Sequence, residues 1–391
     1  MKNATTIEDV EAIVSSLGEI RRPKVLTMVM SKFRSIGKSE RALEVFEEAV
    51  QRGIEPDVYT YSAAIAACEQ SGDWQRALQI VDEMQGHGIE PNVISYSAAI
   101  AVLSKKGQWK RAKCIMDDIR KNGQLEPDLI MYNSLMSAYE KDGQWQQALN
   151  LLREMREFRI RPDIITYSSA ISACEKGKQW EQALELLEET QKYGLKPNLI
   201  TYSAAISACE KVQKWQSALI LLESMRRSGI KADIIVYNAA ISACAKAGQL
   251  EEALAILDEI QIAEVSPNII TYSILISACV KAGHWDRALA LNEELRTEHQ
   301  ITPDLTTYDA LITACTHGKK WDTLMAFFDE MKTKQHLLPN QSIYTAAINA
   351  CEHLGLQQRA SILQQEQKQR KLYTRQKKPP SKRNPGNRLQ L

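Results

Sequence analysis

The strongest constraint on this chain is a repeat of 35 or 36 residues that runs through most of its length. The string Tyr-Ser-Ala-Ala-Ile, or a variant of it, begins at Tyr61, Tyr96, Tyr132, Tyr167, Tyr202, Tyr237, Tyr272, Tyr308 and Tyr344. Self-similarity at a fixed period of this size is typical of repeat proteins, in which every unit is one supersecondary element. The chain is therefore expected to be an array of stacked units.

Each unit closes on an Asp or Asn: Asp57, Asn92, Asp128, Asp163, Asn198, Asp233, Asn268, Asp304 and Asn340. We number the places of a unit from the residue after the preceding closing residue. Eight complete units then fill residues 58–340, a degenerate unit fits residues 23–57, and a partial repeat or cap covers residues 341–372. Residues 1–22 are expected to form a capping helix, and residues 373–391 a basic disordered tail.

The pattern within a unit is helical. With a rotation of about 100° per residue, places 4, 7, 8 and 11 share one stripe, which holds Tyr, Ala or Leu, Ile or Met, and Cys. A Leu-rich second helix follows the Trp at place 17 and ends before Gly or a polar residue and then Pro. One such hairpin cannot bury its own apolar face, so neighbours must stack on it. The predicted fold is all-α, an α-solenoid superhelix of stacked 35–36-residue helical hairpins.

A second face of the first helix carries places 2, 5, 9 and 13; together with the closing residues we call it the ladder surface. Place 5 is small and polar, and place 9 is Ala, Ser or Thr in most units. Place 2 is apolar in Tyr59, Ile94, Ile130, Ile165, Ile200, Ile235 and Ile270, and place 13 is basic in Lys105, Lys141, Lys176, Lys211, Lys246 and Lys281. Single-stranded nucleic acid offers a matching series of base face, base edge and phosphate.

These features resemble the P-type pentatricopeptide repeat family of RNA-binding proteins. The resemblance rests on the 35-residue hairpin that ends in Pro-Asp, on Tyr-Asn or Tyr-Ser near its start and on Ala at place 20, and it covers about residues 23–372. Tetratricopeptide repeats have a period of about 34 residues and the signature Trp-x-x-Leu-Gly-x-x-Tyr, which no unit here carries. The resemblance implies that successive place-2 side chains sandwich a base, while place 5 and the closing residue of the same unit read its edge.

The resemblance also implies a base for most units. The pairs that favour G are Thr27 with Asp57, Ser97 with Asp128, Ser203 with Asp233 and Ser273 with Asp304. Ser62 with Asn92 and Ser168 with Asn198 favour A, Asn133 with Asp163 favours U, and Asn238 with Asn268 favours C or U. Asp309 with Asn340 receives no base. The expected ligand is single-stranded RNA containing 5′-GAGUAG(C/U)G-3′, with place-13 lysines on the phosphates.

Structural explanations compete with these roles. Place-2 side chains could pack on a neighbouring hairpin, the closing Asp or Asn is a good helix cap by itself, and the lysines could form a solvated face. On this alternative the chain is a protein-binding scaffold without base recognition. The fixed frame around a varying place 5 favours RNA, and binding would serve RNA processing, stability or translation, with protein effectors recruited to the transcript.

No catalytic residue, metal site or cofactor is expected. Seven of the eight cysteines occupy place 11 of the core stripe, without a CxxC pair, and are expected to be small buried thiols. The six histidines are scattered, and no His-x-Glu motif accompanies paired cysteines as a zinc deaminase requires.

Charge and hydropathy add little about location. The net charge of the whole chain is +1, and nine basic and no acidic residues follow Glu366. Residues 1–366 therefore carry a net charge of −8. No apolar run approaches the roughly 18 residues of a membrane span. The acidic start, with Glu8, Asp9, Glu11 and Glu19, differs from an Arg-rich organellar presequence. The family points to mitochondria or plastids, while the cytoplasm and a bacterial host stay open.

Overall fold

The structure is a computed structural model that describes residues 23–123, 125–333, 335 and 337–376. Every regular element in these residues is a helix. The first helices of the hairpins are α2 (Pro23–Ser35), α4 (Val58–Ser71), α6 (Val93–Lys105), α8 (Leu129–Asp142), α10 (Ile164–Lys176), α12 (Leu199–Lys211), α14 (Ile234–Lys246), α16 (Ile269–Ala282), α18 (Leu305–His317) and α20 (Gln341–His353). The second helices are α3 (Ser39–Gln51), α5 (Trp74–Gly86), α7 (Trp109–Asn122), α9 (Trp145–Glu157), α11 (Trp180–Lys192), α13 (Trp215–Arg227), α15 (Leu250–Ile262), α17 (Trp285–Thr297), α19 (Trp321–Thr333) and α21 (Gln357–Gln376).

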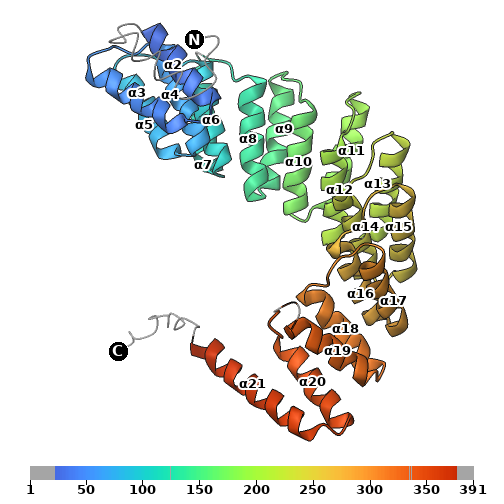
Figure 1. Cartoon of the computed structure of the whole chain (residues 1–391). Coiled ribbons are helices and arrows are strands. Elements are labelled where there is room, and N and C mark those ends of the chain that lie inside the picture. Colours follow the sequence, from blue (N-terminus) through green and yellow to red (C-terminus); the bar gives the residue numbers. More distant parts are fainter. Residues whose placement is uncertain (1–22, 124, 334, 336, 377–391) are drawn as a thin grey trace, which may run out of the picture. The chain divides into compact units, whose positions relative to one another are not determined.

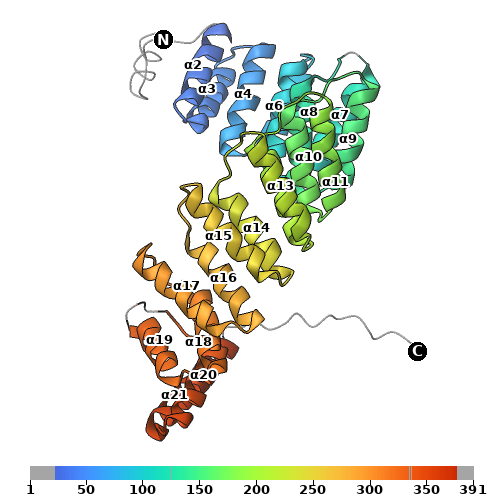
Figure 2. The ribbon, with the colours of Figure 1, turned by 90° about the vertical axis from the view of Figure 1, so that its right-hand side faces the viewer.

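The chain divides into two compact blocks. Of the described residues, the N-terminal block comprises those from 23 to 212 together with 217–231, and the C-terminal block comprises 213–216 and those from 232 to 376. Within each block the hairpins follow one another side by side (Figures 1 and 2). The predicted all-α solenoid of helical hairpins is confirmed.

The first helices form a continuous layer within each block. In the N-terminal block α2 contacts α4, α4 contacts α6, and the series continues through α8 and α10 to α12. In the C-terminal block the same series runs from α14 through α16 and α18 to α20. Each of α3, α5, α7, α9, α11, α15, α17 and α19 also contacts the first helix of the following hairpin. The ladder surface therefore lies on one layer of each block.

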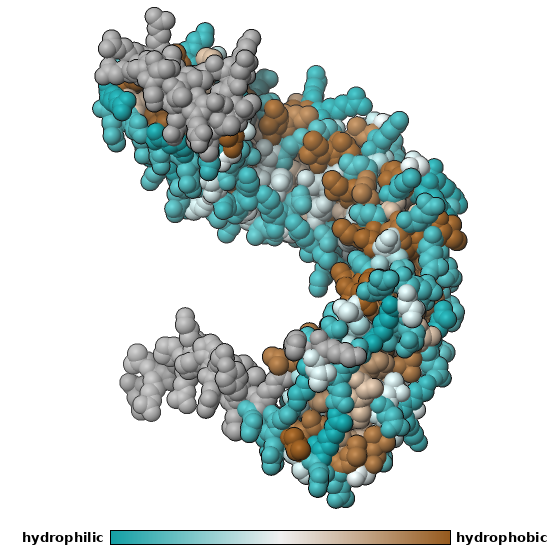
Figure 3. Space-filling view, in the orientation of Figure 1, coloured by the Kyte–Doolittle hydropathy of each residue, from teal (hydrophilic) through white to brown (hydrophobic). Residues whose placement is uncertain are grey.

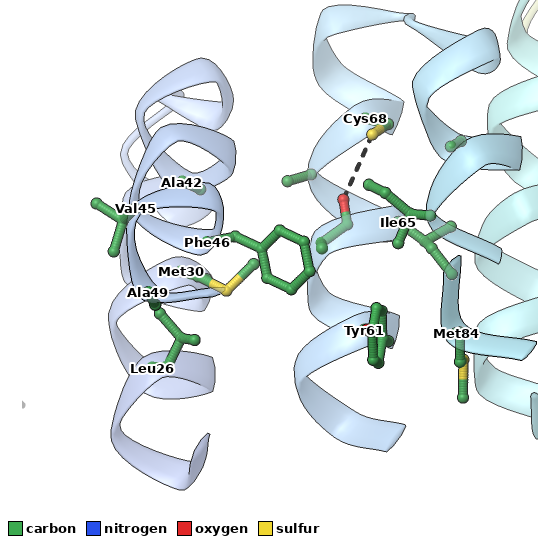
Figure 4. Packing of buried hydrophobic residues seen from close by; sticks show 14 of the residues in the cluster. Leu26, Met30, Ala42, Val45, Phe46, Ala49, Tyr61, Ile65, Cys68 and Met84 are labelled. Carbon is green, nitrogen blue, oxygen red and sulfur yellow. Dashed lines mark hydrogen bonds between the residues drawn. The ribbon is translucent and has the colours of Figure 1, made fainter. Parts of the chain in front are cut away.

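The predicted core stripe is buried. In α4, Tyr61, Ala64, Ile65 and Cys68 are each at most 1% exposed. Phe46 of α3 reaches toward this stripe, and its ring meets that of Tyr61 edge to face at 5.7 Å between centroids (Figure 4). Burial of each large apolar side chain is worth about 1.5–3 kcal/mol, and it comes from the contact between hairpins.

Two expectations fall largely outside the described residues. The capping helix expected in residues 1–22 lies entirely outside the described residues. The part of the basic tail from residue 377 onward lies outside them as well. Helix α21 continues through residues 373–376, which were assigned to the tail. Residues 357–378 contain no Pro or Gly, so no stop signal ends the helix at residue 372.

No helix among the described residues is both long enough and apolar enough to cross a lipid bilayer.

Candidate nucleic-acid interface

The place-2 side chains are exposed on the first helices. Their exposed fractions lie between 55% and 64% in Tyr59, Ile94, Ile130, Ile165, Ile200, Ile235 and Ile270. Figure 3 shows that apolar side chains reach the surface at many points among hydrophilic ones. Isolated exposed apolar residues are ordinary, but a row of them with the period of the repeat is a regular feature of this surface.

A groove in the C-terminal block brings all parts of the ladder surface together. It has a volume of about 310 Å³. Its lining includes Ile270 at place 2, Ser273 at place 5, Ser277 at place 9 and Lys281 at place 13, all on α16. The closing residue of the same unit, Asp304, lines it as well. The four positions that rotation grouped on one face, and the closing residue that the family resemblance associated with them, thus border one hollow.

Several predicted base-reading pairs are in direct contact. The Nδ2 amide of Asn133 donates to both carboxylate oxygens of Asp163, at 3.2 and 3.3 Å. In the C-terminal block, Asn238 Nδ2 donates to Asn268 Oδ1 at 3.2 Å. Further direct contacts join Ser273 Oγ to Asp304 Oδ1 at 3.5 Å and Asn340 Nδ2 to Asp309 Oδ2 at 3.2 Å.

Other pairs are joined through a hydroxyl that the sequence reasoning missed. It belongs to the Thr or Ser at place 3 of the next unit. Thr60 Oγ1 lies 2.9 Å from Thr27 Oγ1 and donates to Asp57 Oδ1 at 2.7 Å. The same link joins Ser62 to Asn92 through Ser95, and Ser168 to Asn198 through Thr201. The signal was present as a recurring Thr or Ser directly before the repeat tyrosine.

Among the described residues, one pair within a single block lacks such a link. Ser97 Oγ is buried without a hydrogen-bond partner, and Met131 stands at place 3 of the next unit. Asp128 still caps α8, where it accepts from the Met131 N–H at 2.9 Å. Ser203 and Asp233 belong to different blocks: Ser203 is half-buried on α12, and Asp233 caps α14 by accepting from Val236 N–H at 2.9 Å.

Every closing residue caps the next first helix with the same atom. Asp57 Oδ1, for example, accepts from the Thr60 N–H at 2.8 Å. The other closing residues accept through Oδ1 in the same way: Asn92, Asp128, Asp163, Asn198, Asp233, Asn268, Asp304 and Asn340. Such a cap is worth about 1 kcal/mol. The cap leaves the second polar atom of each side chain for other contacts, an acceptor oxygen in Asp and a donor nitrogen in Asn.

Asp304 shows the electrostatic result of this arrangement. Burial by itself would raise the pKa of its carboxyl group. Hydrogen bonds from the Thr307 hydroxyl and N–H, from Thr306 and from Ser273 lower the pKa, and together they outweigh the effect of burial. The net pKa therefore lies below the ordinary 3.8. The group is a carboxylate at neutral pH and can act only as an acceptor toward a ligand.

The place-13 lysines form a partly paired row. Lys176 pairs with Glu140 at 3.7 Å and Lys211 with Glu175 at 2.6 Å, and each Glu comes from the preceding unit. The Lys141 ammonium donates to the Ser104 carbonyl at 3.1 Å. Its pKa is lowered, first by burial and then by Lys105 and Lys176, while Glu140 raises it. Successive lysines thus repel one another electrostatically, and an anion bound between them would reduce this repulsion.

The tryptophans at place 17 pack against the following unit. The Trp285 ring stacks on His317 with centroids 4.8 Å apart, and Trp321 stacks on His353 at 4.5 Å. Arg111 lies over Trp74, 3.9 Å from the ring centroid. Each of these rings therefore contacts a side chain of the following hairpin.

One cluster among the described residues has atoms spaced for metal binding. The ligand atoms of Glu294, Glu298 and His299 lie within 4.8 Å of one another at the end of α17. The Tyr272 hydroxyl already donates to Glu294 at 2.6 Å. This hydrogen bond recurs in the array as a contact between the repeat tyrosine and a Glu of the second helix, for example from Tyr167 to Glu189 at 3.2 Å. We therefore assign the cluster a packing role.

Comparison with solved structures supports the fold. The pentatricopeptide repeat protein PPR10 from maize matches with a TM-score of 0.55 and 26% identity, over 83% of this chain and 51% of PPR10. The chain thus spans about half the length of PPR10. PPR10 in complex with an 18-nt psaJ RNA element matches at a TM-score of 0.45 and 25% identity, over 92% and 56% of the two chains. Yeast Rmd9p in complex with a 16-nt target RNA matches at 0.40 and 12% identity, over 94% and 80%.

Sequence families give the same result over most of the chain. No curated protein sequence matches significantly. The pentatricopeptide repeat domain matches residues 44–106, 170–211, 220–282 and 293–353. The PPR repeat family matches residues 127–176 and 267–317, and the PPR repeat matches residues 25–54, 94–124 and 200–230. With the repeat, the hairpins and these matches together, the chain belongs to the pentatricopeptide repeat family.

Proposed function

We propose that this chain binds single-stranded RNA on the ladder surface, with one base for each unit. The observation that carries the proposal is the groove of α16, where an exposed Ile270, a polar Ser273, a basic Lys281 and the Asp304 carboxylate border one hollow. A nucleotide offers a ring face, a polar edge and a phosphate, and each has a matching group there. PPR10, whose fold this chain resembles, has been solved with an 18-nt RNA element.

The closing residue supplies the chemistry that distinguishes G from A. Its Oδ1 is occupied by the helix cap, so its second atom is the one available to a base. In Asp this atom accepts, which suits the N–H groups of guanine. In Asn it donates, and within the described residues the Nδ2 groups of Asn92, Asn198 and Asn268 have no hydrogen bond. A donor suits an acceptor on the adenine or cytosine edge.

Place 5 supplies the distinction between purine and pyrimidine through size. The hydroxyls of Ser62 and Ser168 are buried, and each donates back to a carbonyl of its own helix at 2.7 Å. They therefore leave room rather than reach outward. The longer Asn133 and Asn238 extend to their closing residues and fill that room. A serine unit accommodates the larger base, and an asparagine unit the smaller one.

The proposed target is single-stranded RNA with 5′-GAGUAG(C/U)G-3′, and the proposed role is in RNA processing, stability or translation. The pairs behind this target are those to which the family resemblance assigns a base. The place-13 lysines, including Lys105 and Lys281, are proposed to bind phosphates. Protein effectors recruited to the bound transcript would carry out any later chemistry.

Binding to two labelled RNAs tests the proposal. One contains GAGUAGCG and the other is a scramble of the same composition, both at about 150 mM salt. We expect the designed RNA to bind at least about 100-fold tighter, which is about 2.7 kcal/mol. Equal and weak binding would contradict base reading and would leave protein binding as the better explanation.

The Ser168→Asn variant tests the assignment of one unit to one base. The change fills the room beside Asn198, so we expect the preference at the fifth nucleotide to move from A toward C or U. Preferences at the other nucleotides should stay as in the unchanged protein. A uniform loss of affinity at all positions would instead show that the substitution only damages the fold.

A further inference from the structure

The place-3 hydroxyl touches both members of a base-reading pair. Thr166 Oγ1 donates to Asn133 Oδ1 at 2.5 Å and also lies 2.9 Å from Asp163 Oδ1. In the C-terminal block, Thr271 Oγ1 donates to Asn238 Oδ1 at 2.7 Å and reaches Asn268 Oδ1 at 3.2 Å. The same bridge occurs at Thr60, Ser95, Thr201 and Thr307. We call these side chains the bridging hydroxyls.

The bridge fixes which way an asparagine at place 5 faces. The Asp163 carboxylate only accepts, so it requires the Nδ2 group of Asn133 on its side. The Thr166 hydroxyl then meets Asn133 Oδ1. One Nδ2 hydrogen is used, and the second is left to a ligand. Without the hydroxyl, Asn133 Oδ1 would lose its partner, and the amide could rotate.

The chain contains natural exceptions, and one of them lies within a single block. Beside the pair Ser97 and Asp128, place 3 of the next unit is Met131, which is 1% exposed and has no hydroxyl. Ser97 Oγ is buried there without a hydrogen-bond partner. An unpartnered Ser97 hydroxyl is the result expected where the place-3 hydroxyl is missing.

A substitute bridge occurs near the C-terminus. Place 3 beside the pair Asp309 and Asn340 is Ile343, which also lacks a hydroxyl. Ser342 Oγ, at place 2, lies 2.7 Å from both Asp309 Oδ1 and Asn340 Oδ1, and its hydrogen can be donated to either. The bridge is thus rebuilt from a place that carries an apolar side chain in most units.

We propose that the bridging hydroxyls are positioning residues that set the selectivity of each unit for its base. They do not touch the base; they hold the two side chains that do. The inference rests on the proposed function, and it predicts that Thr166 sharpens the reading of the fourth nucleotide. It also predicts that the third nucleotide, read beside Met131, is read less sharply than the first and eighth, the G positions whose pairs have a bridging hydroxyl in Thr60 and Thr307.

The first test removes one bridge. Thr166→Val keeps the shape of the side chain and deletes the hydroxyl, and the probes are GAGUAGCG RNAs with U, C, A or G at the fourth nucleotide. We expect the preference for U to fall about fivefold, the size of one hydrogen bond, with no change at other nucleotides. Thr166→Ser should restore it. Thr190→Val is the matched control, because the buried Thr190 on α11 donates only to the Leu186 carbonyl, away from the pairs.

The second test adds a bridge. Met131→Thr places a hydroxyl beside Ser97 and Asp128, and we expect the preference for G at the third nucleotide to rise about threefold to tenfold. Thermal unfolding of each variant is measured in parallel. Loss of stability with unchanged selectivity in both Thr166→Val and Met131→Thr would show that the hydroxyl is only part of the helix cap.

Measurements on the unchanged protein distinguish failure of the positioning role from failure of RNA reading itself. If it fails to prefer GAGUAGCG over the scramble, the proposed function fails first. If it prefers the designed RNA and Thr166→Val keeps the full preference for U, RNA reading stands and the positioning role is overturned.

Discussion

At the scale of single residues, the cap made by the closing Asp or Asn is compatible with the proposed base reading, although the two are competing explanations of the sequence. Asp163 caps α10 through Oδ1 at 2.9 Å from the Thr166 N–H. Its other oxygen lies 3.3 Å from Asn133 Nδ2, within the pair. A cap needs only one acceptor atom, so capping does not compete with reading. A residue can therefore be structurally required in every unit and still differ between Asp and Asn.

The cysteines give a prediction at the same scale. Burial raises the pKa of the Cys68 and Cys174 thiols to about 12, whereas Cys114 is exposed on α7. Only the thiolate is a good nucleophile. We expect a thiol reagent at pH 8 to modify Cys114 alone in the folded protein. Mass spectrometry counts the modified cysteines in the native protein and in the denatured protein. Fast labelling of Cys174 in the native state would contradict its burial in the core stripe.

The same shift sets the sign of an alkaline effect. A buried thiol that stays neutral in the fold and ionises near 9.0 when unfolded stabilises the fold fully below pH 9. That contribution is lost as the pH rises toward about 12. The urea midpoint should therefore fall above pH 9.

At the scale of the element, the turn between the two helices of a hairpin requires a left-handed residue. Gly72, Gly143 and Gly283 supply it with φ of 71°, 67° and 82°. In other units Lys178 and Lys319 take the same place with φ of 58° and 55°. A non-glycine residue pays about 1–2 kcal/mol for this conformation. The hairpins tolerate that cost because packing on both neighbours determines the turn.

Lys178→Gly should therefore stabilise the protein. Removing the strain of the side chain outweighs the extra freedom that glycine has in the unfolded chain, so we expect a gain of about 0.5–1 kcal/mol. Urea unfolding measures it. Lys178→Ala is the matched control, since it removes the charge and keeps the Cβ. An equal gain in both variants would show that the lysine charge, and not the backbone, is the cause.

At the scale of the whole molecule, charge decides how RNA of any sequence is attracted. The lysine row runs along a chain whose residues 1–366 carry a net −8, obtained by removing the nine basic residues after Glu366 from +1. Part of the row is already neutralised by pairs such as Lys211 with Glu175 at 2.6 Å. If about six phosphates are neutralised, the slope of log affinity against log salt is about −4. Internal pairing makes the observed slope shallower.

Glu175→Gln tests this competition. It frees Lys211 and removes a negative charge beside the ladder surface, so we expect affinity for both the designed and the scrambled RNA to rise about twofold to fivefold at low salt. Glu188→Gln makes the same change of charge at an exposed site on α11 and is the control. A gain confined to the designed RNA would argue against a general electrostatic effect.

The sequence alone determined the architecture, because a helical period of 35 residues with one buried stripe can be satisfied only by stacking. It also placed Ile270, Ser273 and Lys281 on one surface, since rotation about a helix is fixed by spacing, and the family resemblance associated Asp304 with Ser273. Tertiary structure decided which atoms of neighbouring units meet. The bridge from Thr166 to Asn133 spans 33 residues, and the pair of Lys211 with Glu175 crosses from one unit to the next. Such contacts depend on how hairpins pack, which the pattern within one unit does not contain.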